Sequence, residues 1–354
     1  MLCMAASPQF NLVLGGGGLK GLTHIGVLRA LEERGLTPQA VIGCSMGALV
    51  AAAWACRMPV SAMEERALKV VRTDVFRIAH FDMALKRMLS PAVYRREPLD
   101  HLIHSLVGDV TFRDLTRQLV INTVDLNSGR QVLWGLPGLR DARVADAVFA
   151  SCALPGILPP RAILGRYCID GAVLENLPVR AALAISRAPI IAVDVGGTRV
   201  ERKGVERKGF VTTYSRGLEI VMQTLAAEHL HDWTDPPVVL VRPRVERVSM
   251  FAFNRTPFLL EEGYRAMTKA LDLLPHDLLN LPPGIHPQRE VSVKVDRATC
   301  IGCGACVARA PEIFTMGFDG VAVSTEEKQW WSPLGDYLLT ACPTHAIRAE
   351  QTWP

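Results

Sequence analysis

The chain has 354 residues, of which 49% are hydrophobic and 6% aromatic, and its formal net charge is +4 at neutral pH. This length allows one large domain and a small one, each with a hydrophobic core of its own. The modest charge, without a dense basic stripe, argues against nucleic acid as a partner, and the longest strongly apolar run, residues 46–56, is too short to span a bilayer.

The first part of the chain alternates predicted strands with predicted helices. In chain order we expect a strand at residues 10–14, a helix at about 22–34, a strand at 40–42 and a helix at about 46–56. The first helix turns Ile25, Leu28 and Leu31 toward the core, and the second is apolar almost all round, so it should be buried. Later strands are predicted at 119–124, 131–134, 190–195 and 238–241. Strands separated by helices indicate an α/β fold with a mostly parallel sheet.

A glycine-rich loop joins the first predicted strand to the first helix. Gly16, Gly18 and Gly21 have the spacing of a dinucleotide fingerprint, in which backbone N–H groups hold a pyrophosphate. The same geometry can instead hold the oxyanion that forms when a nucleophile attacks an ester. A dinucleotide site should carry an acidic residue at the end of the second strand, and here that strand runs on without one. The oxyanion is therefore favoured.

The second strand leads into GCSMG at residues 43–47, which has the G-x-S-x-G pattern of a nucleophile elbow. The glycines allow a sharp turn that leaves the hydroxyl of Ser45 exposed at the top of the sheet. Only 27 residues separate Gly18 from Ser45, about one βαβ unit. If the two strands are adjacent, both loops open at the carboxyl edge of the sheet, where the glycine N–H groups can face the carbonyl that Ser45 attacks.

A serine nucleophile needs a base, and Asp170 stands before Gly171 where a strand is expected to turn. Four ordered blocks, GGGGLKG, GCSMG, ASCALPGILPP and DGAVLENLPV, together resemble the patatin-like phospholipase family over residues 10–275. The resemblance implies a three-layer α/β/α fold, lipid or acyl-ester substrates, and a Ser-Asp dyad of Ser45 and Asp170. It also implies an oxyanion loop at Gly16, Gly17 and Gly18. Ala172 departs from the family, many members of which have a second glycine there.

Several other polar side chains have a simpler interpretation. Lys20 and His24 follow the glycine loop and are interpreted as helix-surface or packing residues, whereas His229 and His231 could complete a conventional triad but carry no motif. Asp125 and Asp194 also follow apolar strands without the Asp-Gly context. Free cysteines near the motifs are expected to be small buried hydrophobes; these are Cys44, Cys152 and Cys168.

The C-terminal part carries a second chemistry. CIGCGAC supplies Cys300, Cys303 and Cys306, and Cys342 stands before a proline. The C-x2-C-x2-C run with a distant Cys-Pro is typical of an iron-sulfur cluster, while zinc is the competing metal, although its four-cysteine sites usually pair two C-x-x-C knuckles. Residues 289–350 resemble a single-cluster bacterial-type ferredoxin. The resemblance implies one [4Fe-4S] cluster on all four cysteines, in a small α+β domain.

We therefore predict three parts: an acyl-hydrolase domain at 8–275, a Pro-rich linker at 276–288 and a ferredoxin-like domain at 289–354. The function expected is that of a serine acyl-ester hydrolase of the phospholipase, lysophospholipase or lipase type with a fused electron-transfer or regulatory domain. Two alternatives stay open: an electron-transfer protein whose hydrolase-like domain only binds an acyl ligand or partner, and an NAD(P)-dependent oxidoreductase. The last 66 residues have a net charge of −2 and the rest +6, so we expect the two domains to dock.

The first ten residues lack the charged and apolar regions of a secretory signal, so a cytoplasmic location is expected. A peripheral contact with the inner membrane surface and a redox partner protein are both compatible with the predicted chemistry. Two further segments are interpreted as solvated surface. They are the repeated pentapeptide VERKG at 200–209 and the basic, apolar stretch at 85–99.

Overall fold

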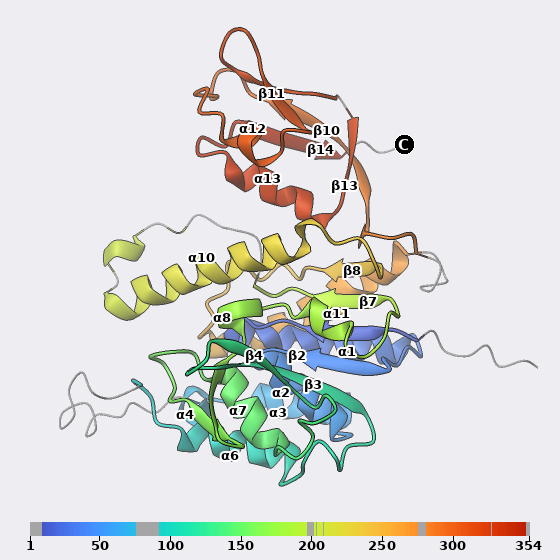
Figure 1. The fold of residues 1–354 in the computed structure, drawn as a ribbon, viewed down its shortest axis with the longest axis vertical. Helices are drawn as coiled ribbons and strands as arrows, with labels where there is room; N and C mark the ends of the chain where they lie inside the picture. Colours follow the sequence, from blue (N-terminus) through green and yellow to red (C-terminus); the bar gives the residue numbers. More distant parts are fainter. Residues whose placement is uncertain are drawn as a thin grey trace, which may run out of the picture.

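The computed structural model describes residues 9–75, 92–196, 202, 204–207, 209–274, 281–326 and 328–351. Nine strands in these residues form one twisted sheet, in the order β5-β6-β3-β2-β1-β7-β8-β9, with β4 paired to β3 (Figure 1). Strands β3, β2, β1, β7, β8 and β9 run parallel to their neighbours in this order, whereas β4 and β6 pair antiparallel with β3, and β5 pairs antiparallel with β6. The bounds are β1 Asn11–Leu14, β2 Ala40–Gly43, β3 Gln118–Asp125, β4 Arg130–Trp134, β5 Arg161–Ile163, β6 Arg166–Asp170, β7 Ile190–Val193, β8 Val238–Val241 and β9 Ile285–His286.

Helices cover both faces of this sheet because successive side chains of a buried strand point to opposite faces. Leu12 and Leu14 pack with the larger core under α1, α2, α7 and α11, whereas Val13 packs with α9 and the end of α10. The result is a three-layer α/β/α domain. The helices are η1 Gly18–Leu22, α1 Thr23–Glu33, α2 Met46–Ala55, α3 Val60–Lys69, α4 Arg72–Val75, α6 Glu97–Val107, α7 Val144–Cys152, α8 Ala172–Glu175, α9 Val179–Ala182, α10 Phe210–His231 and α11 Thr256–Asp272.

The predicted α/β fold is confirmed, and the predicted strands and helices lie within a few residues of the observed ones. All ten residues of α2 are buried, as its uniform hydrophobicity predicts. Ile25, Leu28 and Leu31 of α1 are buried as well. β1 lies directly between β2 and β7, so the loops after β1 and β2 open side by side at the carboxyl edge of the sheet.

The Pro-rich passage expected to be only a linker contributes a strand. Within its described residues 281–288, β9 pairs in parallel with β8, with Val238 opposite Ile285. Prolines are compatible with a short strand at a sheet edge, where one row of N–H groups has no partner strand. Composition alone does not reveal this pairing, because the partner strand lies almost 50 residues away.

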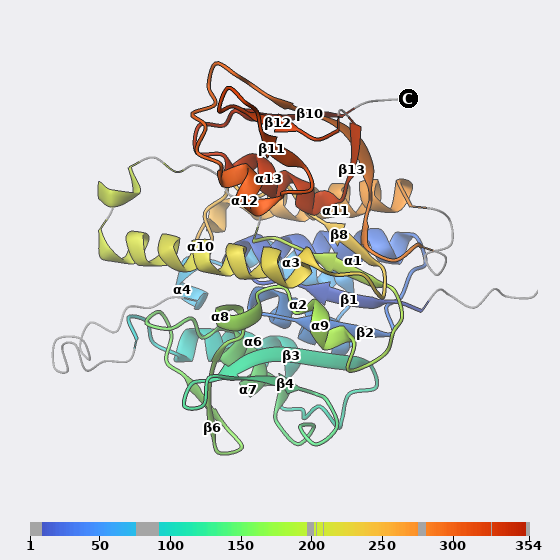
Figure 2. The ribbon, with the colours of Figure 1, turned by 45° about the horizontal axis from the view of Figure 1, so that its top comes forward.

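The C-terminal residues form a small α+β domain with a separate core around Val291, Phe314 and Trp331. Its central strand β10 pairs antiparallel with β13 and β14, and β11 and β12 form a hairpin. Figures 1 and 2 show this domain, in orange and red, against α10. The bounds are β10 Arg289–Val295, β11 Phe314–Met316, β12 Ala322–Ser324, β13 Lys328–Trp331, β14 Ile347–Gln351, α12 Ala305–Arg309 and α13 Asp336–Ala341.

Among the described residues, no helix has the length and apolar character needed to cross a membrane. The basic, apolar stretch at 85–99 falls outside the described residues up to position 91, and so do positions 200, 201, 203 and 208 of the pentapeptide repeat.

Candidate active site and cysteine cluster

Ser45 stands at the sharp turn between β2 and α2, as the nucleophile-elbow motif predicts. Its backbone has φ 54° and ψ −126°, a conformation that is strained for a residue with a side chain. Both flanking glycines are required by close packing: a Cβ on Gly43 would lie 2.5 Å from Ala48 Cα, and one on Gly47 would overlap the carbonyl oxygen of Leu14. The tight turn therefore depends on the small residues of the motif.

A buried serine holds the elbow in place. The amide of Ser45 donates to Oγ of Ser151 at 2.8 Å, and the Ser151 hydroxyl donates in turn to the carbonyl of Asn122 on β3 at 2.7 Å. Ser151 is completely buried at the end of α7. Ser151 lies in the ASCALPGILPP block, but no sequence pattern indicates its role, because the hydrogen bond joins segments more than 100 residues apart.

Asp170 ends β6 beside the elbow and is completely buried. Burial raises the pKa of its carboxyl from 3.8 to about 7, although hydrogen bonds from the Ala172 amide, the Ser45 hydroxyl and the Cys44 thiol oppose the rise. Oδ1 accepts the Ala172 amide at 2.9 Å. Oδ2 has no hydrogen-bond partner of ordinary geometry in the described part of the chain. The Ser45 hydroxyl thus lies beside the carboxyl group and favours its ionised form.

No histidine contributes to the pKa shift of Asp170. His24 is completely buried, its Nε2 donates to the carbonyl of Gly15 at 2.8 Å, and burial lowers its pKa to about 4, so it stays neutral at pH 7. His231 lies at the end of α10 and lines a groove beside the C-terminal domain. Lys20 is buried against Glu219 of α10 at 3.6 Å. These positions agree with packing roles for His24 and Lys20.

The three loop glycines differ in what their amides do. The Gly16 amide donates to the carbonyl of Asn176 at 3.1 Å, and the Asn176 side chain donates back to the Gly16 carbonyl at 3.1 Å. A Cβ on Gly16 would lie 3.0 Å from the Cβ of Ser45, so this glycine lies directly against Ser45. The amides of Gly17 and Gly18 have no acceptor within the residues described.

The thiols near the site are inert. Burial raises the pKa of Cys44, Cys152 and Cys168, so these thiols stay protonated at neutral pH. Cys44 points its thiol at Asp170 Oδ1, 3.7 Å away. The expectation that these cysteines act as small buried groups agrees with their positions.

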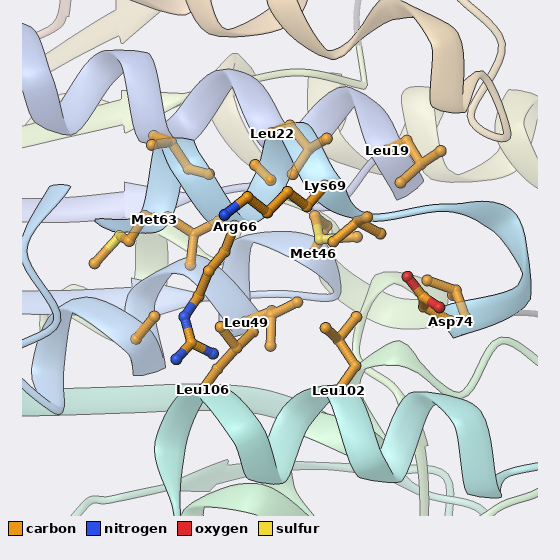
Figure 3. Close-up of a pocket in the computed structure, with 16 residues that line it drawn as sticks. Leu19, Leu22, Met46, Leu49, Met63, Arg66, Lys69, Asp74, Leu102 and Leu106 are labelled. Carbon is orange, nitrogen blue, oxygen red and sulfur yellow. The ribbon is translucent and has the colours of Figure 1, made fainter. Parts of the chain in front are cut away.

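An apolar pocket of about 210 Å³ lies behind the elbow (Figure 3). Met46, the residue after Ser45, and Leu19, the residue after Gly18, both line it. Arg66, Lys69 and Asp74 supply the polar side chains among its lining residues. The pocket lining therefore includes the residues that directly follow Ser45 and the glycine loop, and most of its surface suits a hydrocarbon.

In the C-terminal domain, Cys300, Cys303, Cys306 and Cys342 all line one small cavity. Burial opposes ionisation of Cys342, but hydrogen bonds from Thr344, the Ala346 amide at 3.2 Å and the Ile347 amide outweigh it and lower its pKa. Within the described residues, no three His, Cys, Asp or Glu side chains form a group that could hold a single metal ion. Four thiols around one cavity are the ligand set of a [4Fe-4S] cluster, in which each iron takes one cysteine sulfur.

Fold and site define an α/β domain with a nucleophile elbow and an adjacent buried carboxylate, joined to a four-cysteine α+β domain. Residues 12–183 match the model of the patatin-like phospholipase family, and residues 293–335 match that of the 4Fe-4S single cluster domains. The two family models thus match both parts of the chain, which confirms both resemblances.

Among curated proteins, the chain is 26% identical over 370 residues to an uncharacterized NTE family protein of Mycobacterium tuberculosis, covering 91% of this chain and 97% of that one. It is 27% identical over 215 residues to the Neuropathy target esterase sws of Drosophila melanogaster, covering 59% of this chain and 14% of that protein. It is 31% identical over 190 residues to the Patatin-like phospholipase domain-containing protein 6 of Mus musculus, covering 52% of this chain and 13% of that protein.

Among solved structures, VipD from Legionella pneumophila aligns with a TM-score of 0.39 and 15% identity, covering 76% of this chain and 67% of that one. A chain of the ExoU-SpcU complex of Pseudomonas aeruginosa aligns with a TM-score of 0.41 and 18% identity, covering 78% of this chain and 52% of that one.

Proposed function

We propose that the protein hydrolyses acyl esters of lipids, as a phospholipase, lysophospholipase or lipase, with Ser45 as nucleophile and Asp170 as general base. One observation carries the proposal: a completely buried carboxyl with a pKa of about 7 lies beside a serine held in a nucleophile elbow. A free aspartate is too weak a base to take a proton from a serine hydroxyl, and desolvation strengthens the base by raising its pKa. The patatin-like family match of residues 12–183 and the esterase and phospholipase names of relatives support the lipid class.

In the proposed reaction, Asp170 takes the proton of the Ser45 hydroxyl as its oxygen attacks the acyl carbon. The negative charge moves to the carbonyl oxygen, where the Gly17 and Gly18 amides donate hydrogen bonds to it. Gly16, whose amide is engaged with Asn176, contributes by leaving room beside Ser45. Collapse of this tetrahedral intermediate breaks the ester bond, and the leaving alcohol receives the proton from Asp170. Water, deprotonated by the same carboxylate, then releases the acid and restores Ser45.

The apolar pocket supports a hydrocarbon-bearing substrate. Met46 and Leu19 connect its lining to the two loops that would hold the ester group. We therefore assign the acyl chain to this pocket (Figure 3), where burial of each methylene contributes about 0.8 kcal/mol.

Incubation of the purified protein with an activated short-chain ester tests the proposal, with NADH binding measured in parallel. Ester turnover without nicotinamide binding supports the hydrolase. Tight NADH binding without turnover would instead favour the oxidoreductase, and neither signal would favour an electron-transfer protein with a non-catalytic hydrolase-like domain.

The pH dependence follows from the raised pKa of Asp170. The base is the ionised carboxylate, so kcat/KM should be high above pH 7, reach half its maximum near pH 7 and fall about tenfold per unit at lower pH. A pH profile from 5 to 9 measures this. A midpoint near 4, the value of a solvated aspartate, would contradict a desolvated base at this position.

We also propose that Cys300, Cys303, Cys306 and Cys342 hold one [4Fe-4S] cluster, which would carry single electrons. Anaerobically purified protein should contain roughly four iron and four sulfide per chain. Cys342→Ser should lower both, because it removes the ligand that closes the cavity, whereas Cys56→Ser, a half-buried thiol of the other domain, should change neither. Metal and sulfide analysis measures both variants. Stoichiometric zinc without sulfide would contradict the cluster.

A further inference from the structure

The C-terminal domain packs against α10 and the β8–β9 side of the large sheet (Figures 1 and 2). Arg309 of α12 forms an ion pair of 3.3 Å with Glu228 near the end of α10, and Leu334 packs against the buried cluster that contains Trp233. The expected docking is therefore present. In this ion pair, however, the cation belongs to the C-terminal domain, whose net charge is negative. The net charges of the two domains therefore do not predict the charges of the residues that meet here.

Arg242 bridges the two domains. It follows β8 directly, and its Nη1 donates to the carbonyl of Pro333 in the C-terminal domain at 2.6 Å. Its Nε donates to Oδ2 of Asp194 at 3.2 Å. The side chains of Arg242 and Asp194 are only 22% and 8% exposed. One guanidinium thus holds a carbonyl of one domain and a carboxylate of the other, in a sheltered place where charge-assisted hydrogen bonds are strong.

Asp194 begins a turn that supports the glycine loop. Its Oδ1 accepts the amide of Gly196 at 3.0 Å, and Gln223 of α10 donates to the carbonyl of Gly196 at 2.8 Å. Val195, which stands between Asp194 and Gly196, lies so close to the glycine loop that a Cβ on Gly17 would be 2.8 Å from its Cγ2. The turn is therefore held by Arg242 on one side and backs Gly17 on the other.

We propose that Arg242 is a positioning residue through which the C-terminal domain sets the place of the Gly17 amide. The Pro333 carbonyl orients the guanidinium, the guanidinium holds Asp194, and Val195 presses the turn against Gly17. The two guanidinium contacts are hydrogen bonds, and Val195 lies in close contact with Gly17. Displacement of the guanidinium therefore moves the Gly17 amide. The inference rests on the proposed hydrolase function, because the position of the Gly17 amide affects turnover only if an oxyanion forms there.

Steady-state hydrolysis of an activated ester by the full-length, anaerobically purified protein tests this role. Arg242→Ala should lower kcat about tenfold, less than the 10² to 10³ of losing a whole oxyanion donor. KM should stay within about twofold, because the contact acts in the transition state, and the pH midpoint should not move. The kcat of Arg242→Lys should lie between those of the wild type and Arg242→Ala, since an ammonium keeps the charge without the planar fork of the guanidinium.

Arg29→Ala is the matched control. Arg29 is 29% exposed and also links two separate segments, through Glu64 and Glu261, but it lies on α1, away from the turn. Its replacement should leave kcat unchanged. If Arg242→Ala has a kcat within twofold of this control, Arg242 has no positioning role and the inference is wrong.

Amide hydrogen exchange tests the bridge without turnover. Arg242→Ala should speed exchange both in residues 15–19, where Gly15, Gly16 and Leu19 donate backbone hydrogen bonds, and in residues 330–336, while Arg29→Ala should do neither. Because coupling between sites is reciprocal, a phosphonate on Ser45 should also slow exchange of 330–336 in the wild type and not in Arg242→Ala.

Unchanged exchange in both segments of Arg242→Ala would overturn the inference, as would a phosphonate that leaves 330–336 of the wild type unaffected. If the wild type neither turns over ester nor reacts with the phosphonate, the proposed function fails instead. The exchange comparison of the unreacted proteins still decides whether Arg242 joins the two domains.

Discussion

Ser45→Ala should lower ester turnover by roughly 10⁴-fold or more, because it deletes the oxygen proposed to attack the acyl carbon. The elbow should keep its shape, since the amide of residue 45 still donates to Oγ of Ser151 and both flanking glycines remain. Two measurements check this expectation: kcat on an activated ester, and covalent labelling by a fluorophosphonate, which needs the serine oxygen.

Ser186→Ala provides the control. Ser186 is a half-buried serine that accepts hydrogen bonds from Asn11 and Gln39 at the opposite edge of the sheet, so its loss should leave turnover and labelling intact. Near wild-type turnover by Ser45→Ala, or labelling at another residue, would mean that the nucleophile lies elsewhere.

Asp170→Asn should lower kcat about 10³-fold, within the range that general-base catalysis contributes. The amide has the shape of the carboxyl group but cannot take the Ser45 proton at any pH in the working range. The fall in activity below pH 7 should therefore disappear together with most of the activity. A pH profile of the residual turnover measures both effects in one experiment.

Asp125→Asn is the matched control, because Asp125 also ends a buried strand but holds a local turn through Asn127 and Ser128 and an ion pair with Arg166. It should retain wild-type turnover. A large loss on changing His229 or His231, with Asp170→Asn still active, would contradict the dyad and indicate a conventional triad.

Several features of this protein could be predicted from sequence because their causes are local. Hydrophobic periodicity predicted α1, α2 and the strands around them. The turn at Ser45 was predictable because its geometry depends on Gly43 and Gly47, which stand two residues away on either side. The spacing of the tail cysteines predicted that they would meet around one cavity, since three of them share one short loop.

Other features were decided only by the tertiary structure. The pKa of Asp170 depends on complete burial among residues distant in the chain, so no motif could indicate a value near 7. The Gly16 amide is taken by Asn176, 160 residues away, which separates Gly16 from Gly17 and Gly18 in role. The bridge from Pro333 through Arg242 to Asp194 likewise joins three remote segments. Desolvation and hydrogen-bond partners are set by which groups the fold brings together, and a local sequence pattern carries no information on either.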